Sequence, residues 1–288
     1  MKRHLVLLAG LAIVPLAAFP DTARAAESFD SCKGTIASLP AVIGSAGTWC
    51  LTASLATSAT SGAAITINSN NVTIDCNDYI VSGLAAGAGT ATVGVLAVGR
   101  INVGVRNCHL RGFRIGIQGS GSTFLVRDNR IEASTIRGVS LGGDALVVAD
   151  NQVVDTGGSS IGNGAAIGMS IGGNARVTGN NVTGVAARAA SGQGAWGIHI
   201  ADEGAPAQSL VEDNSVRSLV PDGVGLAVAI RSTSAGRISL RRNALFGEGT
   251  GIGLQCANAG GAVRENSLLG FATAISGCSS DGGNTVKP

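Results

Sequence analysis

The chain has 288 residues, of which 44 are glycine, 3% are aromatic and 13% are charged. This much glycine is unfavourable inside helices, and its spacing lacks the Gly-X-Y period, so a helical bundle and a collagen triple helix are both excluded. The formal net charge of +2 gives no general electrostatic attraction to nucleic acid or to an anionic membrane.

Residues 1–25 have the pattern of a secretory signal peptide. Lys2 and Arg3 form a basic start, an apolar run extends from Leu5 to Ala18, and Ala23-Arg24-Ala25 is a small-x-small cleavage site. The apolar run is shorter than the ~20 residues that span a membrane. We therefore expect a secreted or periplasmic protein with no membrane anchor after cleavage, whose mature chain has no net charge.

The first segment after the signal, residues 26–60, does not fit the repeat that follows it. A solenoid exposes unpaired strand edges at its two ends, and these edges need a cap. We expect residues 26–60 to form the N-terminal cap, with a Cys32–Cys50 disulfide as its clamp, ahead of one β-helix domain formed by residues 61–288.

The rest of the chain repeats a short step, Asp/Asn-Asn-x-hydrophobic. Its marker residue recurs at Cys76, Cys108, Asn129, Asn151, Asn180, Asn214, Asn243 and Asn266. The shortest steps between markers, 21 to 23 residues, define the basic coil, and longer steps contain loop insertions. A second pattern, Gly-hydrophobic-x-hydrophobic, follows the markers, as at 138–141, 197–200, 223–226 and 251–254. Both patterns have the period of two that is typical of short strands.

Such strands bury their apolar sides only when the coils stack, about 4.8 Å apart, with each strand paired to its copy in the next coil. The sequence therefore predicts an all-β protein, a right-handed single-stranded parallel β-helix of about nine coils. The marker asparagines should form a ladder of side-chain amides, and asparagine also tolerates the left-handed backbone of a tight turn. A leucine-rich repeat is disfavoured because leucine is not dominant, and an antiparallel sandwich because the unit is constant.

All six cysteines follow the signal, where disulfides are permitted. Cys76 and Cys108 occupy matching places in consecutive units, and Cys256 and Cys278 are about one coil apart. Together with Cys32–Cys50, these neighbour bridges are the simplest pairing, although other connectivities remain open. No Cys-x-x-Cys or His-x-His spacing indicates a metal site. The cluster Asp75, Asn77 and Asp78 hints at calcium but is explained better by turn formation, so no cofactor is expected.

The loop insertions fall between Asn151 and Asn243, and neighbouring insertions can line a groove. Within this region His199 should face outward on its strand, beside Trp196. An imidazole can act as a general base near neutral pH, Asp202 or Glu203 could orient it, and Trp196 could stack on a sugar. The alternative is an ordinary surface histidine followed by a solvated acidic turn.

Arginines could neutralise the carboxylate of a uronate, which suits their forked geometry. Arg188 and Arg231 are the candidates for this role, and Asp222 is a further candidate for substrate binding. A denser basic stretch could bind an anionic polymer or could simply compensate nearby carboxylates. It comprises Arg106, Arg111, Arg114, Arg127, Arg130 and Arg137.

The Asn-x-hydrophobic and Gly-Ile-x-Ile units resemble the repeat of the pectate-lyase-like superfamily. The segments Gly47 to Leu51, Val72 to Asn77 and Val105 to Phe113 are similar to the opening of secreted bacterial members. The resemblance covers residues 60–286 approximately and implies a parallel β-helix that cleaves or epimerises polysaccharides, mostly uronates. The Gly-His-Gly string of polygalacturonases, the Asp-Pro-His-Asp string of alginate epimerases and the Trp-Ile-Asp-His string of pectate lyases are absent. No family residue is therefore carried over.

Two functions from different classes remain. The first is a secreted carbohydrate-active protein, a polysaccharide lyase that cleaves uronate-containing glycans by β-elimination, with His199 as base and Arg188 or Arg231 neutralising the carboxylate. The second is a non-catalytic β-helix that binds glycans or surfaces, or serves as a structural protein of the cell envelope. In both cases the expected partner is a polysaccharide or cell-surface glycan, and we expect a monomer.

Overall fold

The computed structural model describes residues 31–162, 164–202, 206–257 and 261–288. The predicted signal peptide lies outside these ranges. Within them the regular structure is β, apart from one three-residue 3-10 helix, Leu84–Ala86. These ranges contain no helix that is long and apolar enough to cross a membrane.

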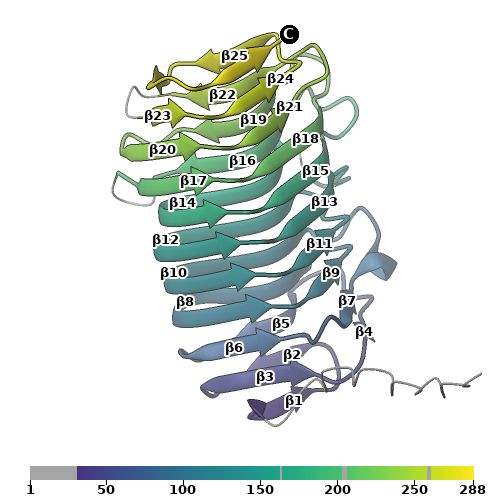
Figure 1. The fold of residues 1–288 in the computed structure, drawn as a ribbon. Coiled ribbons are helices and arrows are strands. Elements are labelled where there is room, and N and C mark those ends of the chain that lie inside the picture. Colours follow the sequence, from purple (N-terminus) through teal and green to yellow (C-terminus); the bar gives the residue numbers. More distant parts are fainter. Residues whose placement is uncertain (1–30, 163, 203–205, 258–260) are drawn as a thin grey trace, which may run out of the picture. The chain divides into compact units, whose positions relative to one another are not determined.

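The strands of residues 31–288 stack as a parallel β-helix, which confirms the predicted fold class (Figure 1). Each coil contributes to three faces, which we name A, B and C in chain order. In the middle coils one long bent strand covers both face A and face B. These long strands are β8 (Val93–Arg106), β10 (Ile115–Arg127), β12 (Arg137–Ala149) and β14 (Ala166–Thr178).

In the other coils faces A and B have separate strands, all belonging to one 17-stranded sheet in the described ranges. Face A adds β2 (Ala41–Ile43), β5 (Ala63–Ile67), β16 (Ala195–Ala201), β19 (Ala227–Ser232), β22 (Ile252–Cys256) and β25 (Thr273–Ser276). Face B adds β1 (Gly34–Ile36), β3 (Gly47–Leu51), β6 (Val72–Asp75), β17 (Gln208–Glu212), β20 (Arg237–Arg241), β23 (Gly261–Arg264) and β26 (Ser279–Ser280).

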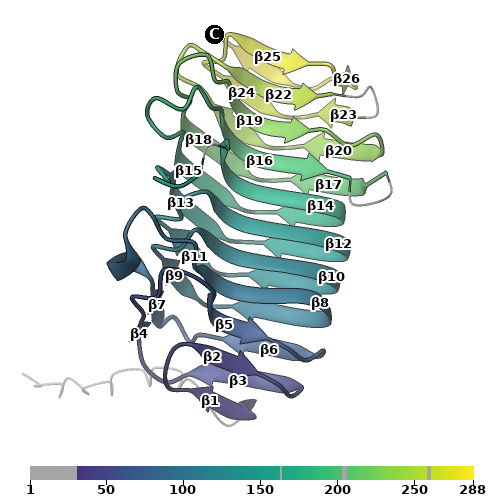
Figure 2. The ribbon, with the colours of Figure 1, turned by 180° about the vertical axis from the view of Figure 1, so that it is seen from behind.

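Face C is a ten-stranded parallel sheet in the described ranges, close to the predicted nine coils. Its strands are β4 (Leu55–Ala56), β7 (Ile80–Ser82), β9 (His109–Arg111), β11 (Arg130–Glu132), β13 (Gln152–Gly157), β15 (Asn181–Ala186), β18 (Ser215–Val220), β21 (Ala244–Phe246), β24 (Ser267–Leu269) and β27 (Thr285–Lys287). Loops between face C and face A project from one side of the stack (Figure 2).

The core consists of apolar columns that run along the stack. One column on face A joins Ile117, Val139, Met169, Ile198 and Ile230, each at most 2% exposed. Each fully buried side chain of this size contributes about 1.5–3 kcal/mol relative to an exposed one. These strands are too short to be stable alone. Burial of their apolar side chains along the whole column stabilises them in the stack.

The predicted asparagine ladder is present at the corner between faces B and C. Each marker amide is almost fully buried and donates to the oxygen of the next marker and to a backbone carbonyl of the preceding coil. The amides of Asn151, Asn180 and Asn214 also donate to a carbonyl of their own coil. The ladder runs through Asn129, Asn151, Asn180, Asn214, Asn243 and Asn266 and ends on Asn284.

One detail of the ladder prediction is wrong: the marker is not the left-handed residue. The left-handed residue precedes it, with φ between 51° and 67°, at Asn107, Asp128, Asp150, Gly179, Asp213, Arg242 and Glu265. This residue forms the turn. The marker after it directs its side-chain amide into the stack, where buried backbone carbonyls need a hydrogen-bond donor. The turn therefore accepts several residue types, whereas the ladder position does not.

The three predicted disulfides, Cys32–Cys50, Cys76–Cys108 and Cys256–Cys278, are confirmed. Cys76 and Cys108 hold the ladder positions of two early coils, and the backbone amide of Cys108 donates to Asn129 Oδ1 at 3.0 Å. The covalent bridge thus continues directly into the amide ladder.

Two segments differ from the expected pattern. Residues 34–56, within the expected cap, already form β1 to β4, which pair in parallel with the following coils. They lie at the end that a cap would cover, and their role as a cap stays a prediction. The predicted strand at 223–226 is wrong, because this segment is a loop in which Val224 is 94% exposed. The strand of that coil is β19, whose side chains Val228, Ala229 and Ile230 are buried.

Candidate functional site

Two outward columns on face A bring the strongest candidates together. In the first, Arg137, Ile167 and Trp196 are Cα partners on β12, β14 and β16. In the second, Ser170, His199 and Arg231 are partners on β14, β16 and β19. Three of the predicted site residues, Trp196, His199 and Arg231, are therefore neighbours.

These three side chains form one contact cluster. The guanidinium carbon of Arg231 lies 4.1 Å from the centre of the Trp196 ring, a cation–π contact. The His199 ring is edge-on to Trp196, with ring centres 5.2 Å apart. His199 Nε2 also lies 3.0 Å from Thr233 Oγ1. The imidazole is thus oriented by a hydroxyl and an indole, and the predicted carboxylate partner is replaced by these two groups.

Burial is the main cause that lowers the pKa of His199, from 6.5 to about 4, and the charges of Arg231 and Arg137 lower it further. The imidazole is consequently neutral at neutral pH. It can accept a proton or a hydrogen bond from a ligand, while the positive charge of the cluster is supplied by arginine.

This lowered pKa predicts an acid-sensitive contribution to stability. Between pH 6.5 and 4 the unfolded chain binds a proton on residue 199 that the folded chain does not bind, so the free energy of unfolding falls as the pH falls through this window. Wild type should lose up to about 3 kcal/mol more than His199→Gln across it. Urea titrations at several pH values measure the difference, and parallel curves for the two proteins would contradict the assignment.

Two adjoining clefts extend from this cluster over β10, β12 and β14. The larger, of about 480 Å³, is lined by Arg114, Arg137 and Trp196 together with Gly162, Gly164 and Ala165, which follow β13. The smaller, of about 250 Å³, is lined by Gln118, Arg137, Ser140 and Ser170 and by small residues. We call the two clefts, with His199 and Arg231 beside them, the face A groove.

The face A groove is cationic. No Asp or Glu is among the residues that line either cleft in the described part of the chain. The Nε atoms of Arg114, Arg137 and Arg231 are buried, and no hydrogen-bond partner for them occurs among the described residues. Burial lowers the pKa of Arg137, and the charge of Arg114 lowers it further. Arg137 Nη1 donates to Ser140 Oγ at 3.3 Å, but none of the three arginines pairs with a carboxylate in the described ranges, so an anion in the groove would supply the missing counter-charge.

The remaining predicted site residues lie elsewhere. Both oxygens of Asp202 are used by the corner between faces A and B: they accept hydrogen bonds from the amides of Ala235 and Ala207 and from the Ser234 hydroxyl, which lower its pKa. Glu203 lies outside the described residues. Asp202 therefore fastens a turn and does not orient His199.

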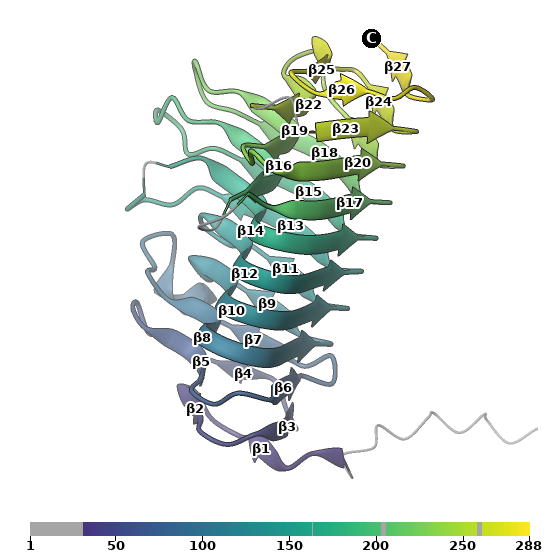
Figure 3. The ribbon, with the colours of Figure 1, turned by 90° about the vertical axis from the view of Figure 1, so that its left-hand side faces the viewer.

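The other two candidates lie in the loops between β15 and β16 and between β18 and β19. The loops that join face C to face A project from the stack (Figure 3). Asp222 accepts a hydrogen bond from the Gly192 amide at 2.8 Å, the main cause of its lowered pKa, and so ties two successive loops together. Arg188 is exposed on the first of these loops, where its carbonyl accepts hydrogen bonds from Ser191. Arg137, which the sequence places in the basic stretch, lies in the same column as Trp196, and its charge lowers the pKa of His199.

The basic stretch divides into two groups. Arg106 pairs with Asp75, Arg127 with Asp128, and Arg130 and Arg111 with Glu132. These four arginines compensate nearby carboxylates. Arg114 and Arg137 have no such partner in the described ranges and belong to the face A groove.

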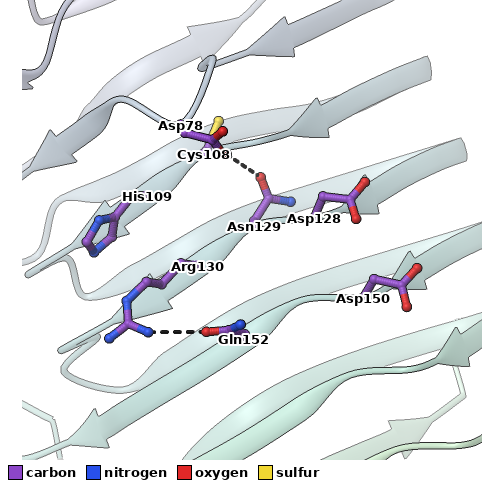
Figure 4. Close-up of a pocket in the computed structure, with 8 residues that line it drawn as sticks. All are labelled: Asp78, Cys108, His109, Asp128, Asn129, Arg130, Asp150 and Gln152. Atoms are coloured by element: carbon purple, nitrogen blue, oxygen red, sulfur yellow. Dashed lines mark hydrogen bonds between the residues drawn. The ribbon is translucent and has the colours of Figure 1, made fainter. Parts of the chain in front are cut away.

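A further cleft of about 380 Å³ lies at the corner between faces B and C (Figure 4). It is lined by Asp78, Cys108, His109, Asp128, Asn129, Arg130, Asp150 and Gln152. Its polar groups are largely used internally: Asn129 belongs to the ladder, Arg130 donates to Gln152, and Arg127 pairs with Asp128. No group of three or more His, Cys, Asp or Glu side chains in the described ranges is placed to hold a metal ion. The face A groove is therefore the better candidate site.

Comparison with known proteins gives a likeness in fold. No protein-family model and no curated protein sequence matches the chain. Among solved structures the chain is similar to the Dettilon tailspike protein, with a TM-score of 0.52 and 14% identity over 87% of this chain and 58% of that one. The chain thus spans a little over half of the tailspike chain, and at this identity the similarity concerns the parallel β-helix alone.

Proposed function

We propose that this protein is a secreted or periplasmic carbohydrate-active β-helix protein, related to the pectate-lyase-like superfamily, that binds uronate-containing glycans in the face A groove. The proposal depends mainly on Arg114, Arg137 and Arg231, which have no carboxylate partner in the described ranges. They lie with Trp196 at a groove whose described lining contains no Asp or Glu. A uronate supplies both a carboxylate for a guanidinium and an apolar ring face for an aromatic side chain.

Arg231→Gln is expected to weaken the binding of uronate oligosaccharides by about 10- to 100-fold, because a charge-assisted hydrogen bond in a partly buried site is lost. Calorimetric titration with oligosaccharides from alginate, pectate, hyaluronan and glucuronan measures the effect. Arg237→Gln is the matched control, since Arg237 is exposed on β20 of face B. Equal binding of a neutral oligosaccharide, or no binding of any uronate by wild type, would refute the proposal.

Elimination is a second candidate function, favoured by the neutral His199 beside Arg231. In this reaction the unprotonated nitrogen of His199 takes the proton from the carbon next to the uronate carboxylate. The electron pair forms the carbon–carbon double bond as the adjacent glycosidic C–O bond breaks, and the departing oxygen takes a proton from water, while the imidazolium of His199 returns its proton to solvent. Because the pKa of His199 is about 4, the base is weak, and the step depends on arginines that neutralise the carboxylate.

The ultraviolet absorbance of the unsaturated product distinguishes binding from elimination. If the protein is a lyase, His199→Gln should retain binding of the oligosaccharide and form no product. If wild type forms no unsaturated product from any of the four polymers, elimination is refuted and the binding function remains.

A further inference from the structure

We infer that Arg114 and Arg137 form a separate subsite for a tetrahedral oxyanion, a sulfate or phosphate ester carried by the glycan. This inference rests on the proposed function for the identity of the carrier, and on the structure for the anion. It divides the face A groove into a carboxylate subsite at Arg231 and an ester subsite at Arg114 and Arg137.

The two arginines are adjacent across neighbouring coils. The carbonyl of Arg114 accepts hydrogen bonds from the amides of Ile136 at 3.0 Å and Arg137 at 3.2 Å, and the Cα partner of Arg137 is Ile115. Both side chains line the cleft of about 480 Å³, and both have a buried Nε without a partner. The side chains of Arg114 and Arg137 therefore line the same cleft.

Two long loops border the cleft that Arg114 and Arg137 line. The turns that lead into β10 and β12 are short, whereas the loops that lead into β8 and β14 are long and meet each other where the Ser160 amide donates to the Ala88 carbonyl at 3.0 Å. The second loop packs closely on Ile136 at Gly162, where a Cβ atom would come within 2.6 Å of that side chain. Arg114 and Arg137 therefore lie in a notch that has Ile136 and Gly162 on one side.

A second cluster of arginines, on face B and at its corner with face C, has a carboxylate of this protein as its counter-ion. Arg176, Arg241 and Arg242 all pair with Glu212, whose side chain is only 3% exposed. The same chain thus compensates one arginine cluster with a buried carboxylate and leaves the pair in the notch without one. An external anion is the natural counter-charge for the pair in the notch.

The charge of the notch favours an ester over a carboxylate. The subsite at Arg231 has one guanidinium, beside a neutral histidine, which matches one planar carboxylate. The notch has two guanidinium groups, which together offer more donors than two oxygens can accept. A sulfate or phosphate ester presents three terminal oxygens, and a phosphate ester carries up to two negative charges. Either ester can therefore accept hydrogen bonds from both guanidinium groups.

Small anions test the subsite without any glycan. Millimolar sodium sulfate or phosphate should raise the melting temperature of wild type above the value in sodium acetate or chloride at equal ionic strength, because an anion that binds only the folded state stabilises it. Arg114→Gln and Arg137→Gln should lose this increase, and Arg237→Gln should keep it. The anion with the larger effect identifies the ester. The inference would be overturned if acetate raised the melting temperature of wild type as much as sulfate or phosphate does. It would also be overturned if sulfate or phosphate raised the melting temperature of Arg137→Gln as much as that of wild type.

A glycan experiment separates the subsite from the proposed function. Arg137→Gln should weaken the binding of a sulfated or phosphorylated uronate oligosaccharide about tenfold more than the binding of its unesterified counterpart, whereas Arg231→Gln should weaken both to the same extent. Equal weakening of both ligands by Arg137→Gln would overturn the ester subsite while uronate binding stands. Absence of uronate binding with the small-anion effect intact would instead refute the proposed function. Arg137→Lys, which keeps the charge and the stem, controls for misfolding and should restore part of the affinity.

Discussion

Asn180→Ala is expected to lower the free energy of unfolding by about 3 kcal/mol, because it leaves several buried polar groups without a partner. Asn180 is 1% exposed. Its Oδ1 accepts from the backbone and side-chain amides of Asn151, and its Nδ2 donates to Val148, Thr178 and Asn214. Alanine cannot replace any of these bonds, and the ladder is interrupted in the middle of the stack.

The next residue provides the matched control. Asn181 starts β15, and its Oδ1 is buried without a hydrogen-bond partner in the described ranges. Asn181→Ala removes the same atoms but relieves an unsatisfied oxygen, so its effect should stay below about 1 kcal/mol. Urea denaturation followed by circular dichroism measures both variants. Equal losses would show that the ladder adds nothing beyond local packing.

The ladder and the disulfides were predictable because each depends on one chemical property that the sequence states directly. A buried amide that must both donate and accept along the stack leaves little alternative to asparagine, so the marker recurs visibly. The left-handed position before it tolerates Asp, Asn, Gly, Arg and Glu, as at Asp128 and Arg242. Such variety hides the turn in the sequence, which is why the left-handed conformation was assigned to the wrong residue.

The cluster of Trp196, His199 and Arg231 was predictable in part, because loop insertions mark the coils that carry it. The sequence does not identify Arg137 as a member, because along the chain it stands with the other arginines of the basic stretch. A signal was present: Arg137-Gly138-Val139 and Trp196-Gly197-Ile198 share one pattern, and the structure places both first residues in the same column. Alignment of the coils on the glycine would have joined them. The outward position tolerates many residue types, so composition alone did not reveal the column.

The roles of Asp202 and Asp222 could not be predicted from the sequence. An aspartate in an inserted loop either faces a ligand or fastens the loop, and the choice depends on which backbone amides come within reach after the coils stack. The partners of Asp202, at Ala207, Ser234 and Ala235, belong to two different turns, one of them in the next coil. Such partners are set by loop conformation, for which the repeat carries no information.

Gly143→Ala is expected to destabilise the protein by more than about 4 kcal/mol or to prevent folding, because the new Cβ atom would collide with backbone. Gly143 lies at the corner between faces A and B with φ of 133°, and an added Cβ would lie 1.8 Å from the carbonyl oxygen of Gly121 in the preceding coil. Gly173 stands in the same relation to Gly143, at 1.9 Å. These three coils approach through backbone, and no side-chain movement can relieve the contact.

Gly99→Ala separates this collision from simple conformational strain. Gly99 also has a positive φ, 64°, but an added Cβ would meet nothing within 4 Å, so alanine there should cost only about 1 kcal/mol. Soluble yield and urea denaturation compare the two variants, and a similar loss in both would mean that the coils can separate at this corner. The comparison bears on function, because the smaller cleft of the face A groove is lined by Gly142 and Gly172 at the same corner. The close approach of backbone that forbids a side chain at Gly143 also fixes the spacing of the strands that carry Arg137 and Ser170, and a ligand that spans the groove depends on that spacing.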